Sequence, residues 1–297
     1  MPSHCAVSGC RTTIMIIVAM VNDLGPTNVK LWNNLGIDMN NTSFQNPAHP
    51  DRQIYVFADA LHLLKLIRNN FIDHSFTLNS PFRNITSGSV RELVMRSESD
   101  LKTAHNISYK HLDVKGVSRM NVKLAAQLMS NTIAKSLQYF GQQNLLKSKD
   151  WQDTSNFISL VDSWFDLFNS RTPNNIKKKA KAAYGIHLEY QNQILSEMLT
   201  TAKNMRVGEK GSLYPFQKGI ILSCTSLSSL FAMVSQRYNV KYIMTYRLNQ
   251  DGLEHFFGCI RQMGIAHQHP SPVHFKHMAC YSSAGNPHII DNSCHIL

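Results

Sequence analysis

The chain has 297 residues, of which 43% are hydrophobic and 16% are charged. This composition is typical of a folded globular protein and argues against a disordered one. The formal net charge of +11 favours a polyanionic partner, nucleic acid before membrane.

Two features of the composition bear on the cellular compartment. The six cysteines are scattered without a CxxC pair, which indicates free thiols of a reducing compartment. The one strong apolar run near the N-terminus, residues 14–21, is far shorter than the ~20 residues that a membrane span needs. We therefore interpret it as part of a buried strand and expect no membrane partner.

The first predicted strand, residues 12–21, is continuous, β-branched and apolar, as in a central strand covered on both faces. Asp23 follows it directly. The carboxyl end of such a strand is the usual place for a functional group in an α/β sheet, although an aspartate here also suits the opening of a turn. A helix pattern then runs through residues 29–35 and stops at Gly36.

A second strand is predicted at residues 53–58, followed by a helix over residues 63–70. Asp59 stands at the start of this helix, where its side chain can accept amide hydrogen bonds as an N-cap. His62, three residues on, is either a partner of that acid or a packed surface histidine.

The middle of the chain changes character. From about residue 79 to about residue 102 Ser, Asn, Arg and Thr dominate, which predicts a junction without strands. Helix patterns then cover residues 117–140, 156–169, 186–205 and 220–238, and Thr154 or Ser155 is expected to cap the second. The basic run at residues 177–181 is more typical of a solvated helix face than of a phosphate-binding patch.

Near the end of the second of these helices, residues 164–169 read Trp-Phe-Asp-Leu-Phe-Asn. Asp166 and Asn169 are able to hydrogen-bond a purine edge while an aromatic ring stacks on the base. The alternative is that the aromatic stripe is simply core. No G-x-x-x-x-G-K-[ST] motif occurs in the chain, so a nucleotide would not be bound by that type of loop.

A third strand is predicted at residues 240–245, before a helix that begins near Asp251. Asp251 and Glu254 are three residues apart and so share a helix face, while Leu253, Phe256, Phe257 and Ile260 are expected to hold the opposite side against a core. Two carboxylates on a rigid element suit Mg²⁺. The alternative is that the acids only complement the helix dipole.

Histidines gather near the C-terminus. They could bind zinc, but prolines interrupt the cluster and no paired finger spacing is present, so surface histidines are the default reading. The residues concerned are His267, His269, His274, His277 and Cys280.

Six segments together resemble the P-element family of DNA transposases, including their THAP-type vertebrate relatives. They occur in the family's order between about residues 18 and 275. The segments are MVNDLGPTNVKLWNNLGI, RQIYVFADALHLLKLIRNN, RMNVKLAAQLMSNTIAKSL, FISLVDSWFDLFNSR, FQKGIILS and YRLNQDGLEHFFGCIRQMG.

The resemblance implies a fold class of α/β plus all-α, an incomplete RNase H-like fold interrupted by a mainly helical GTP-binding insertion. The expected divisions are an RNase H-like segment at 1–80, the insertion at 81–215 and a return to the RNase H-like fold at 216–297. It further implies cut-and-paste DNA transposition in the nucleus, DDE-type chemistry with Mg²⁺, GTP as an assembly cofactor and DNA transposon ends as partner.

By motif, the resemblance also assigns roles to single residues. Asp23 and Glu254 match the second and third catalytic acids, and Asp251 matches a residue shared between the metal and nucleotide sites. Asp166 and Asn169 match the guanine-recognition pair. Two further matches are nucleotide contacts at Lys123 and Asp100, where loop lengths vary, and a D-x-x-H feature near the site at Asp59 and His62.

The family's first catalytic aspartate and its zinc-coordinating DNA-binding domain are expected upstream of the segment that begins this chain. Two-metal chemistry needs carboxylates from both sides, so we expect a truncated or remnant copy with little activity alone. A sheet edge left open would favour a homo-oligomer. The alternatives are a domesticated, non-enzymatic GTP- and DNA-binding protein, and a non-functional fragment that does not fold stably.

Overall fold

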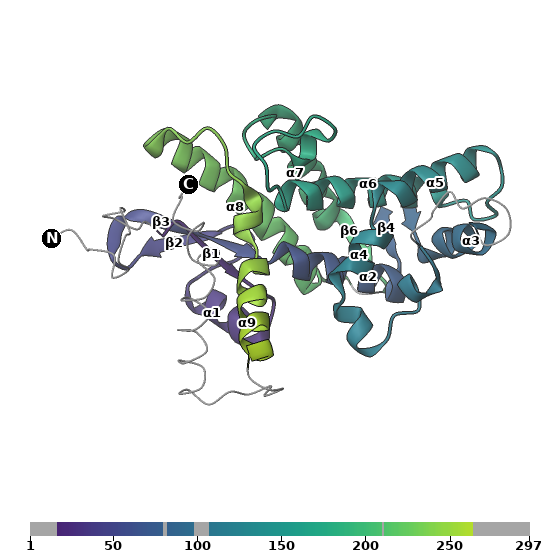
Figure 1. Ribbon diagram of the computed structural model, residues 1–297, viewed down its shortest axis with the longest axis horizontal. Helices are drawn as coiled ribbons and strands as arrows, with labels where there is room; N and C mark the ends of the chain where they lie inside the picture. Colours follow the sequence, from purple (N-terminus) through teal and green to yellow (C-terminus); the bar gives the residue numbers. More distant parts are fainter. Residues whose placement is uncertain (1–16, 80–81, 98–106, 210, 264–297) are drawn as a thin grey trace. The chain divides into compact units, whose positions relative to one another are not determined.

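The computed structural model of the chain describes residues 17–79, 82–97, 107–209 and 211–263. The chain divides into a main unit, Ala19–Asn249, and a terminal unit, which combines Met1–Val18 with Gln250–Leu297. Figure 1 labels most of their helices and strands. In chain order the elements are β1 (Ala19–Asn22), α1 (Pro26–Asn34), β2 (Ser43–Asn46), β3 (His49–Ala58), α2 (Ala60–His74), β4 (Phe76–Asn79), β5 (Phe82–Ile85), α3 (Ser87–Ser97), η1 (Tyr109–His111), η2 (Gly116–Met120), α4 (Val122–Leu128), α5 (Asn131–Gln142), α6 (Trp151–Phe168), η3 (Lys179–Lys181), α7 (Leu188–Asn204), β6 (Met205–Val207), α8 (Pro215–Tyr238), η4 (Thr245–Leu248) and α9 (Asp251–Met263).

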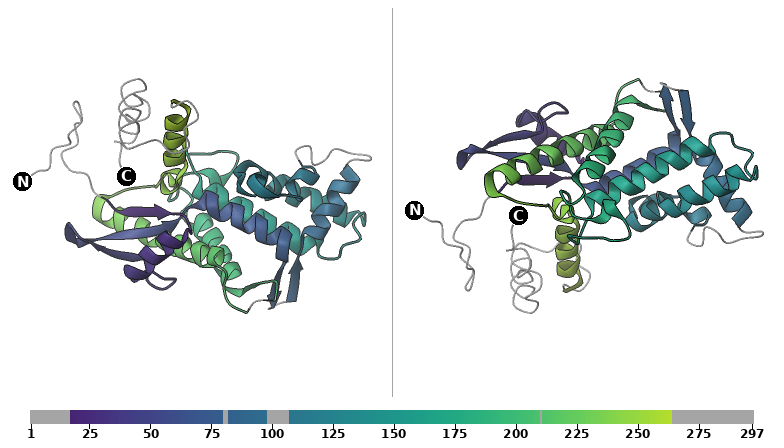
Figure 2. Two further views of the ribbon diagram at one scale, coloured as in Figure 1. Left: turned by 90° about the horizontal axis from the view of Figure 1, so that it is seen from below. Right: turned by 90° about the horizontal axis from the view of Figure 1, so that it is seen from above.

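The first sheet of the main unit has the order β1-β3-β2. Strands β1 and β3 are parallel and pair Asn22 with Ala58 at their carboxyl ends, whereas β2 runs antiparallel to β3. Helix α8, far away in sequence, packs on β3, and Figure 2 shows it running beside this sheet. One face of β3 is therefore covered by a helix that follows the mainly helical middle of the chain.

Gly219 explains how closely α8 approaches the sheet. A Cβ at this position would lie 2.8 Å from Leu63 Cδ2 and 3.1 Å from Ala58 Cβ, so a larger residue would force the helix outwards. The side chains of Ser223 and Ser226 reinforce the contact, because they hydrogen-bond the backbone of Ala58 and Val56. Glycine and serine in α8 thus tie it to the strand that ends next to Asp59.

The second sheet has the order β5-β4-β6 and lies beside the helical region. Helix α6 is the centre of that region, packing on α5, α7 and β5. Its Trp164 and Phe168 are fully buried, with ring centroids 5.2 Å apart. These two rings are core, as the alternative reading of the aromatic stripe held.

Helix α8 is long and apolar enough to cross a membrane by length and composition alone, with a mean hydropathy of 1.4 over its most apolar window. However, 56% of that window is buried inside the fold. Core helices of water-soluble domains have the same character, and the buried serines of α8 bond the sheet. Among the described residues it is the one helix of this kind.

Several predicted elements are confirmed. Helix α1 ends next to Gly36, which has φ +69° as expected for a residue that stops a helix. Strand β3 contains the predicted residues 53–58 and extends further towards the N-terminus. Asp59 caps α2, since its Oδ2 accepts the His62 amide at 2.9 Å. Helices α7 and α8 also occupy the predicted regions.

Two strand predictions are wrong. Residues 240–245 do not form a strand: their one strand-type pairing with a described residue is an isolated bridge between Ile243 and Tyr184, with two hydrogen bonds of 2.8 Å. Without a neighbouring strand, an apolar β-branched segment has no ladder to join. Conversely, residues 79–102 were expected to lack strands, yet β5 pairs with β4 there. Tertiary pairing overrides the weak local propensity.

Strand β1 also differs from its prediction. It lies at the edge of the described sheet, with its four residues half-buried, whereas a central strand covered on both faces was expected. Residues 12–16 of the predicted strand lie outside the described residues, and Ile17 is 56% exposed. The apolar run therefore overstated the burial of this strand.

The helix predicted over residues 117–140 is split into η2, α4 and α5. Ser130 adopts an extended conformation, with ψ 151°, and starts α5, so the apolar periodicity continues across a real break. The predicted caps of α6 are also wrong. The helix begins one turn earlier, and Thr154 and Ser155 are fully buried within it, where Ser155 Oγ donates to Ala134 O at 2.9 Å.

Candidate nucleotide and metal sites

The carboxyl end of α6 carries a buried cluster of charges. Asp162 and Asp166 are four residues apart and face the same side of the helix. Lys178 Nζ lies 2.9 Å from Asp162 Oδ2 and 2.9 Å from Asp166 Oδ2. Lys181 Nζ lies 3.4 Å from Asp166 Oδ1. Asp166 is only 9% exposed. The ammonium groups of Lys178 and Lys181 hold its carboxylate in place.

The pKa values of this cluster follow from burial and charge. Burial raises the pKa of the Asp166 carboxyl, and repulsion by Asp162 adds to this, although the Lys178 hydrogen bond offsets part of it. Burial works against the charge of Lys178, but its hydrogen bonds to Asp166 and Asp162 outweigh burial and raise its pKa. The lysine is therefore held in its charged form.

Such a carboxylate still has acceptor capacity. An ionised carboxylate offers about four lone-pair positions, and the two lysine contacts use one position on each oxygen. Guanine presents two neighbouring donors, its N1–H and its 2-amino group, whereas adenine presents an acceptor at N1. Asp166 therefore has the charge and the free positions that guanine recognition requires.

Asn169 is the C-cap residue of α6. Its Oδ1 atom is buried and has no hydrogen-bond partner. A buried acceptor left without a donor costs roughly 1–3 kcal/mol. Asp166 and Asn169, one turn apart, thus combine a buried carboxylate with an unsatisfied amide oxygen, and the residues fit a base with several N–H donors.

The end of α6 is fixed to the segment that precedes α9. Thr245 of η4 donates its hydroxyl to Leu167 O and accepts the Ser170 amide at 3.1 Å. The Tyr246 amide donates to Ser170 O at 3.1 Å. Thr245 and Ser170 are buried, so these bonds anchor η4 to the end of α6.

The two other predicted nucleotide contacts are less informative. Lys123 is an exposed residue in the first turn of α4, a helix that packs on α2. Asp100 lies outside the described residues. Both stay predictions.

Asp23 lies at the carboxyl edge of the first sheet. Asp23 and Asp59 follow the paired residues Asn22 and Ala58, so the parallel pairing of β1 and β3 brings both acids to one edge. The Asp59 amide donates to Asn22 O at 2.8 Å. This edge also holds His62 and the buried Lys65, whose charges act on Asp23.

The Asp23 carboxylate is oriented from one side. Its Oδ1 accepts the Gly25 amide at 2.9 Å and the Asn28 amide group at 2.6 Å. The Gly25 hydrogen bond lowers the pKa of Asp23; burial opposes it, and Asn28 and the nearby positive charges add to it. Both hydrogen bonds use Oδ1, so Oδ2 is available. An ionised, half-exposed carboxylate with an available oxygen fits a hydrated Mg²⁺.

The acidic helix α9 belongs to the terminal unit. Asp251 and Glu254 are both in its first turn, and the Glu254 amide donates to Gln250 O at 2.8 Å. Glu254 is exposed and Asp251 is half-buried. This exposure fits acids that bind a metal and equally acids that complement the helix dipole. Leu253 is 51% exposed, so the expectation that it packs against a core is wrong. It lies in the first turn of α9 between the two acids, on a part of the helix that faces solvent.

Within each unit, no group of three or more His, Cys, Asp or Glu side chains that could hold a metal is found among the described residues. The main unit contributes Asp23, and the terminal unit contributes Asp251 and Glu254. The histidine cluster at residues 267–280 lies outside the described part of the chain. A shared metal site of Asp23, Asp251 and Glu254 stays a prediction.

Sequence reasoning missed Lys178 and Lys181 as site residues. The basic run was interpreted as a solvated helix face, but residues 179–181 form a short 3-10 helix with Ala180 buried. A signal existed in the sequence: two lysines spaced by three face the same direction on a short turn, and acids at 162 and 166 are also one turn apart. Matching the two patterns requires knowing that the chain folds back, which the sequence does not give.

Comparison with known proteins identifies two domain families along the chain. Residues 61–182, which include Asp166, Asn169 and both lysines, match the model of the TNP-like GTP-binding insertion domain. Residues 246–278, which include Asp251 and Glu254, match the TNP-like RNase H C-terminal domain. The chain thus contains segments of both domains within a mixed α/β fold with small sheets.

Individual relatives extend the likeness along most of the chain. The Transposable element P transposase of Drosophila melanogaster is 38% identical over 265 residues, or 88% of this chain and 34% of the relative. The DNA transposase THAP9 of Homo sapiens is 27% identical over 274 residues, or 88% of this chain and 30% of the relative. The chain therefore spans about a third of the length of these relatives.

A solved structure also resembles this fold, the Drosophila P element transposase strand transfer complex. The two chains superpose with a TM-score of 0.82 at 37% identity, covering 92% of this chain and 62% of the other. At this identity the resemblance extends beyond the fold alone. The chain is a homologue of the P element transposase and THAP9 family over about 88% of its own length.

Proposed function

We propose that the main unit binds a guanine nucleotide at the carboxyl end of α6, with Asp166 and Asn169 reading the base. The observation that carries this proposal is the buried Asp166 carboxylate beside the unpartnered Asn169 Oδ1. The match of residues 61–182 to a GTP-binding insertion domain supports it. In this role GTP is a bound cofactor, and Lys123 and Asp100 are further contacts to be tested.

The same proposal includes the acids of the sheet edge and of α9. Asp23, Asp251 and Glu254 supply carboxylates for Mg²⁺, and Asp23 and Glu254 are catalytic acids of DDE-type strand transfer. When bound, Mg²⁺ would stabilise the charge that develops on the attacked phosphate. Asp23 presents an ionised oxygen whose direction is fixed by its two hydrogen bonds. His62 and Asp59 support that edge.

DNA is the proposed macromolecular partner, and the nucleus the proposed compartment. The similar solved structure is a strand transfer complex of a transposase, and the net charge of +11 favours a polyanion. Exposed lysines at 177 and 179 flank the charge cluster. We further propose that the RNase H-like parts are residues 1–80 and 216–297, interrupted by residues 81–215; the packing of α8 on β3 supports this division.

Titration of the chain with GTP and with ATP tests the nucleotide proposal. GTP is expected to bind at least about tenfold more tightly than ATP, because Asp166 repels the acceptor at adenine N1. Lys177→Met, an exposed change outside the charge cluster, is the control variant and should bind both nucleotides as the unmodified chain does. Equal affinity for the two nucleotides would remove the basis of the proposal.

A Mg²⁺-dependent cleavage assay on DNA separates the enzymatic from the purely binding function. Cleavage that disappears in both Asp23→Asn and Glu254→Gln would assign strand-transfer chemistry to these acids. GTP and DNA binding without any cleavage would instead favour the non-enzymatic binding protein.

A further inference from the structure

A cavity in the main unit lies at the opposite end of α6 from the charge cluster. It has a volume of about 370 Å³, is partly open to solvent, and is lined by the start of α6, by α7 and by the β4–β5 hairpin. Asp153, in the first turn of α6, and Asp166 are thirteen residues apart, which along a helix is roughly 20 Å. The cavity is therefore separate from the proposed guanine site.

The floor of the cavity is apolar and firmly packed. Arg83 and Ile85 are two residues apart on β5 and so face the same side, while Leu78 pairs directly with Arg83 from β4. Phe157 of α6 is buried and its ring stacks edge-on against Phe76, with centroids 5.3 Å apart. Leu78 and Ile85 are buried as well. The floor is thus a fixed apolar surface on which a small apolar group can rest.

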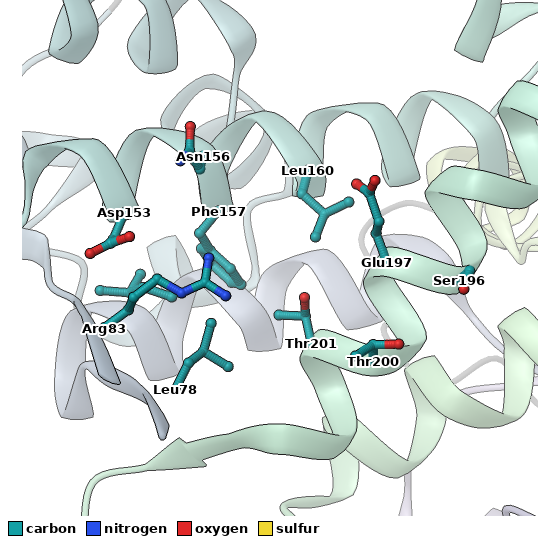
Figure 3. Close-up of a pocket in the computed structure, with 11 residues that line it drawn as sticks. Leu78, Arg83, Asp153, Asn156, Phe157, Leu160, Ser196, Glu197, Thr200 and Thr201 are labelled. Atoms are coloured by element: carbon teal, nitrogen blue, oxygen red, sulfur yellow. The ribbon is translucent and has the colours of Figure 1, made fainter. Parts of the chain in front are cut away.

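The rim of the cavity carries three charges. Figure 3 shows the Arg83 guanidinium extending from the strand towards the helices, with the Asp153 carboxylate to one side and Glu197 across the space. Hydroxyl groups of Ser196, Thr200 and Thr201 complete the α7 wall. The cavity therefore combines one cation, two acids and neutral donors above an apolar floor.

The Arg83 guanidinium forms no ion pair with an acid of the described residues. Its Nε atom is buried and makes no hydrogen bond, and no acid of the described residues lies within salt-bridge distance of it. Asp153 attracts it electrostatically but does not bond it. A guanidinium without a partner prefers a carboxylate or phosphate, which it binds through two parallel hydrogen bonds.

The two acids restrict which anion fits. Burial raises the pKa of Asp153, the charge of Arg83 offsets part of this, and repulsion by Asp150 adds to it, so Arg83 balances this carboxyl only in part. Glu197 accepts one hydrogen bond from Gln193 at 2.9 Å. A phosphate dianion would be repelled by both acids, whereas a ligand that carries both a carboxylate and an ammonium group satisfies all three charges.

We propose that this cavity binds a small zwitterion with an apolar side group, such as a free aliphatic amino acid. Its carboxylate contacts Arg83, its ammonium group lies between Asp153 and Glu197, and its side group rests on Leu78 and Phe157. The cavity volume is within the range of small-molecule sites, roughly 300–1,000 Å³.

Calorimetric titration of the whole chain with three matched probes tests this proposal. L-leucine carries both charges, 3-methylbutylamine lacks the carboxylate and 4-methylpentanoate lacks the ammonium group. Leucine is expected to bind at least about tenfold more tightly than either analogue, since each loses one charged contact. Equal binding of all three, or no binding of leucine at its solubility limit, would overturn the proposal.

Variants locate the site and keep the test independent of folding. Arg83→Gln should abolish the preference for leucine over 3-methylbutylamine, while Asp153→Asn should weaken both of these ligands. Arg91→Gln, which removes an exposed arginine paired with Asp113 at 2.8 Å, is the matched control and should change nothing. Near-ultraviolet circular dichroism establishes that each variant is folded, and unchanged leucine affinity in a folded Arg83→Gln would contradict the proposal.

Discussion

Lys178→Met is the sharpest probe of the charge cluster at the end of α6. The substitution removes one ammonium group that lies 2.9 Å from each of two carboxylates. Asp166 would then keep only Lys181 at 3.4 Å, and Asp162 would face it without a counter-ion. Because Asp166 is buried, this repulsion is poorly screened by solvent.

The magnitude follows from burial. A hydrogen bond to a charged group contributes about 1.5–3 kcal/mol when buried, but the Lys178 side chain is 39% exposed, and solvent screening reduces this. We therefore expect the free energy of unfolding to fall by about 1–2 kcal/mol. The folded pKa of Lys178 is raised, so the contribution is fully present at neutral pH and is lost only as pH rises through that raised pKa.

Urea unfolding at neutral pH measures the effect, with Lys177→Met as the control. Lys177 is exposed, so its variant should unfold as the unmodified chain does. Adding Asp162→Asn to Lys178→Met should recover part of the lost stability, because one of the two facing charges is removed. Equal stability of the Lys178 and Lys177 variants would refute the reasoning.

Three further predictions follow from packing, charge and protonation. Gly219→Ala should destabilise the chain by about 1–3 kcal/mol through overpacking, measured by thermal unfolding, whereas Gly252→Ala, a helix position with open space around its Cβ, should not. Asp23→Asn should keep the turn, because an amide oxygen also accepts the Gly25 amide, while Mg²⁺ affinity measured by titration falls; unchanged affinity would exclude Asp23 as a ligand. GTP affinity should decrease as pH falls through the raised pKa of Asp166, since protons compete with the base for the carboxylate. Lys178→Met should shift this decrease to higher pH, because the carboxylate loses a positive neighbour. An unchanged pH profile would argue that Lys178 does not act on Asp166.

The sequence allowed the local features of the fold to be predicted, and the structure shows why. Asp59 caps α2 and Gly36 ends α1, because both roles depend on a single residue and its immediate neighbours. The strand expected at residues 240–245 failed for the opposite reason. Pairing depends on whether another strand lies alongside, and in the described part of the chain Ile243 forms just an isolated bridge, with Tyr184.

The residues of the candidate sites also differ in whether local sequence or the folding of the chain reveals them. Asp166 and Asn169 can be proposed from their motif. Lys178 is twelve residues from Asp166 in the sequence and contacts it because the chain folds back onto α6, which no local pattern indicates. Arg83 was not singled out, because nothing local distinguishes an arginine in a polar segment. Its significance comes from the cavity formed by α6, α7 and the β4–β5 hairpin, which no local pattern encodes.

The most direct measurement of the central claim is the nucleotide specificity of Asp166→Asn. A carboxylate accepts the N1–H and 2-amino donors of guanine, whereas an amide in the same place can donate to the 2-carbonyl of xanthine. The unmodified chain should bind GTP more tightly than XTP, and Asp166→Asn should reverse that order while remaining folded. An Asp166→Asn variant that keeps the original preference for GTP would contradict guanine recognition at the end of α6.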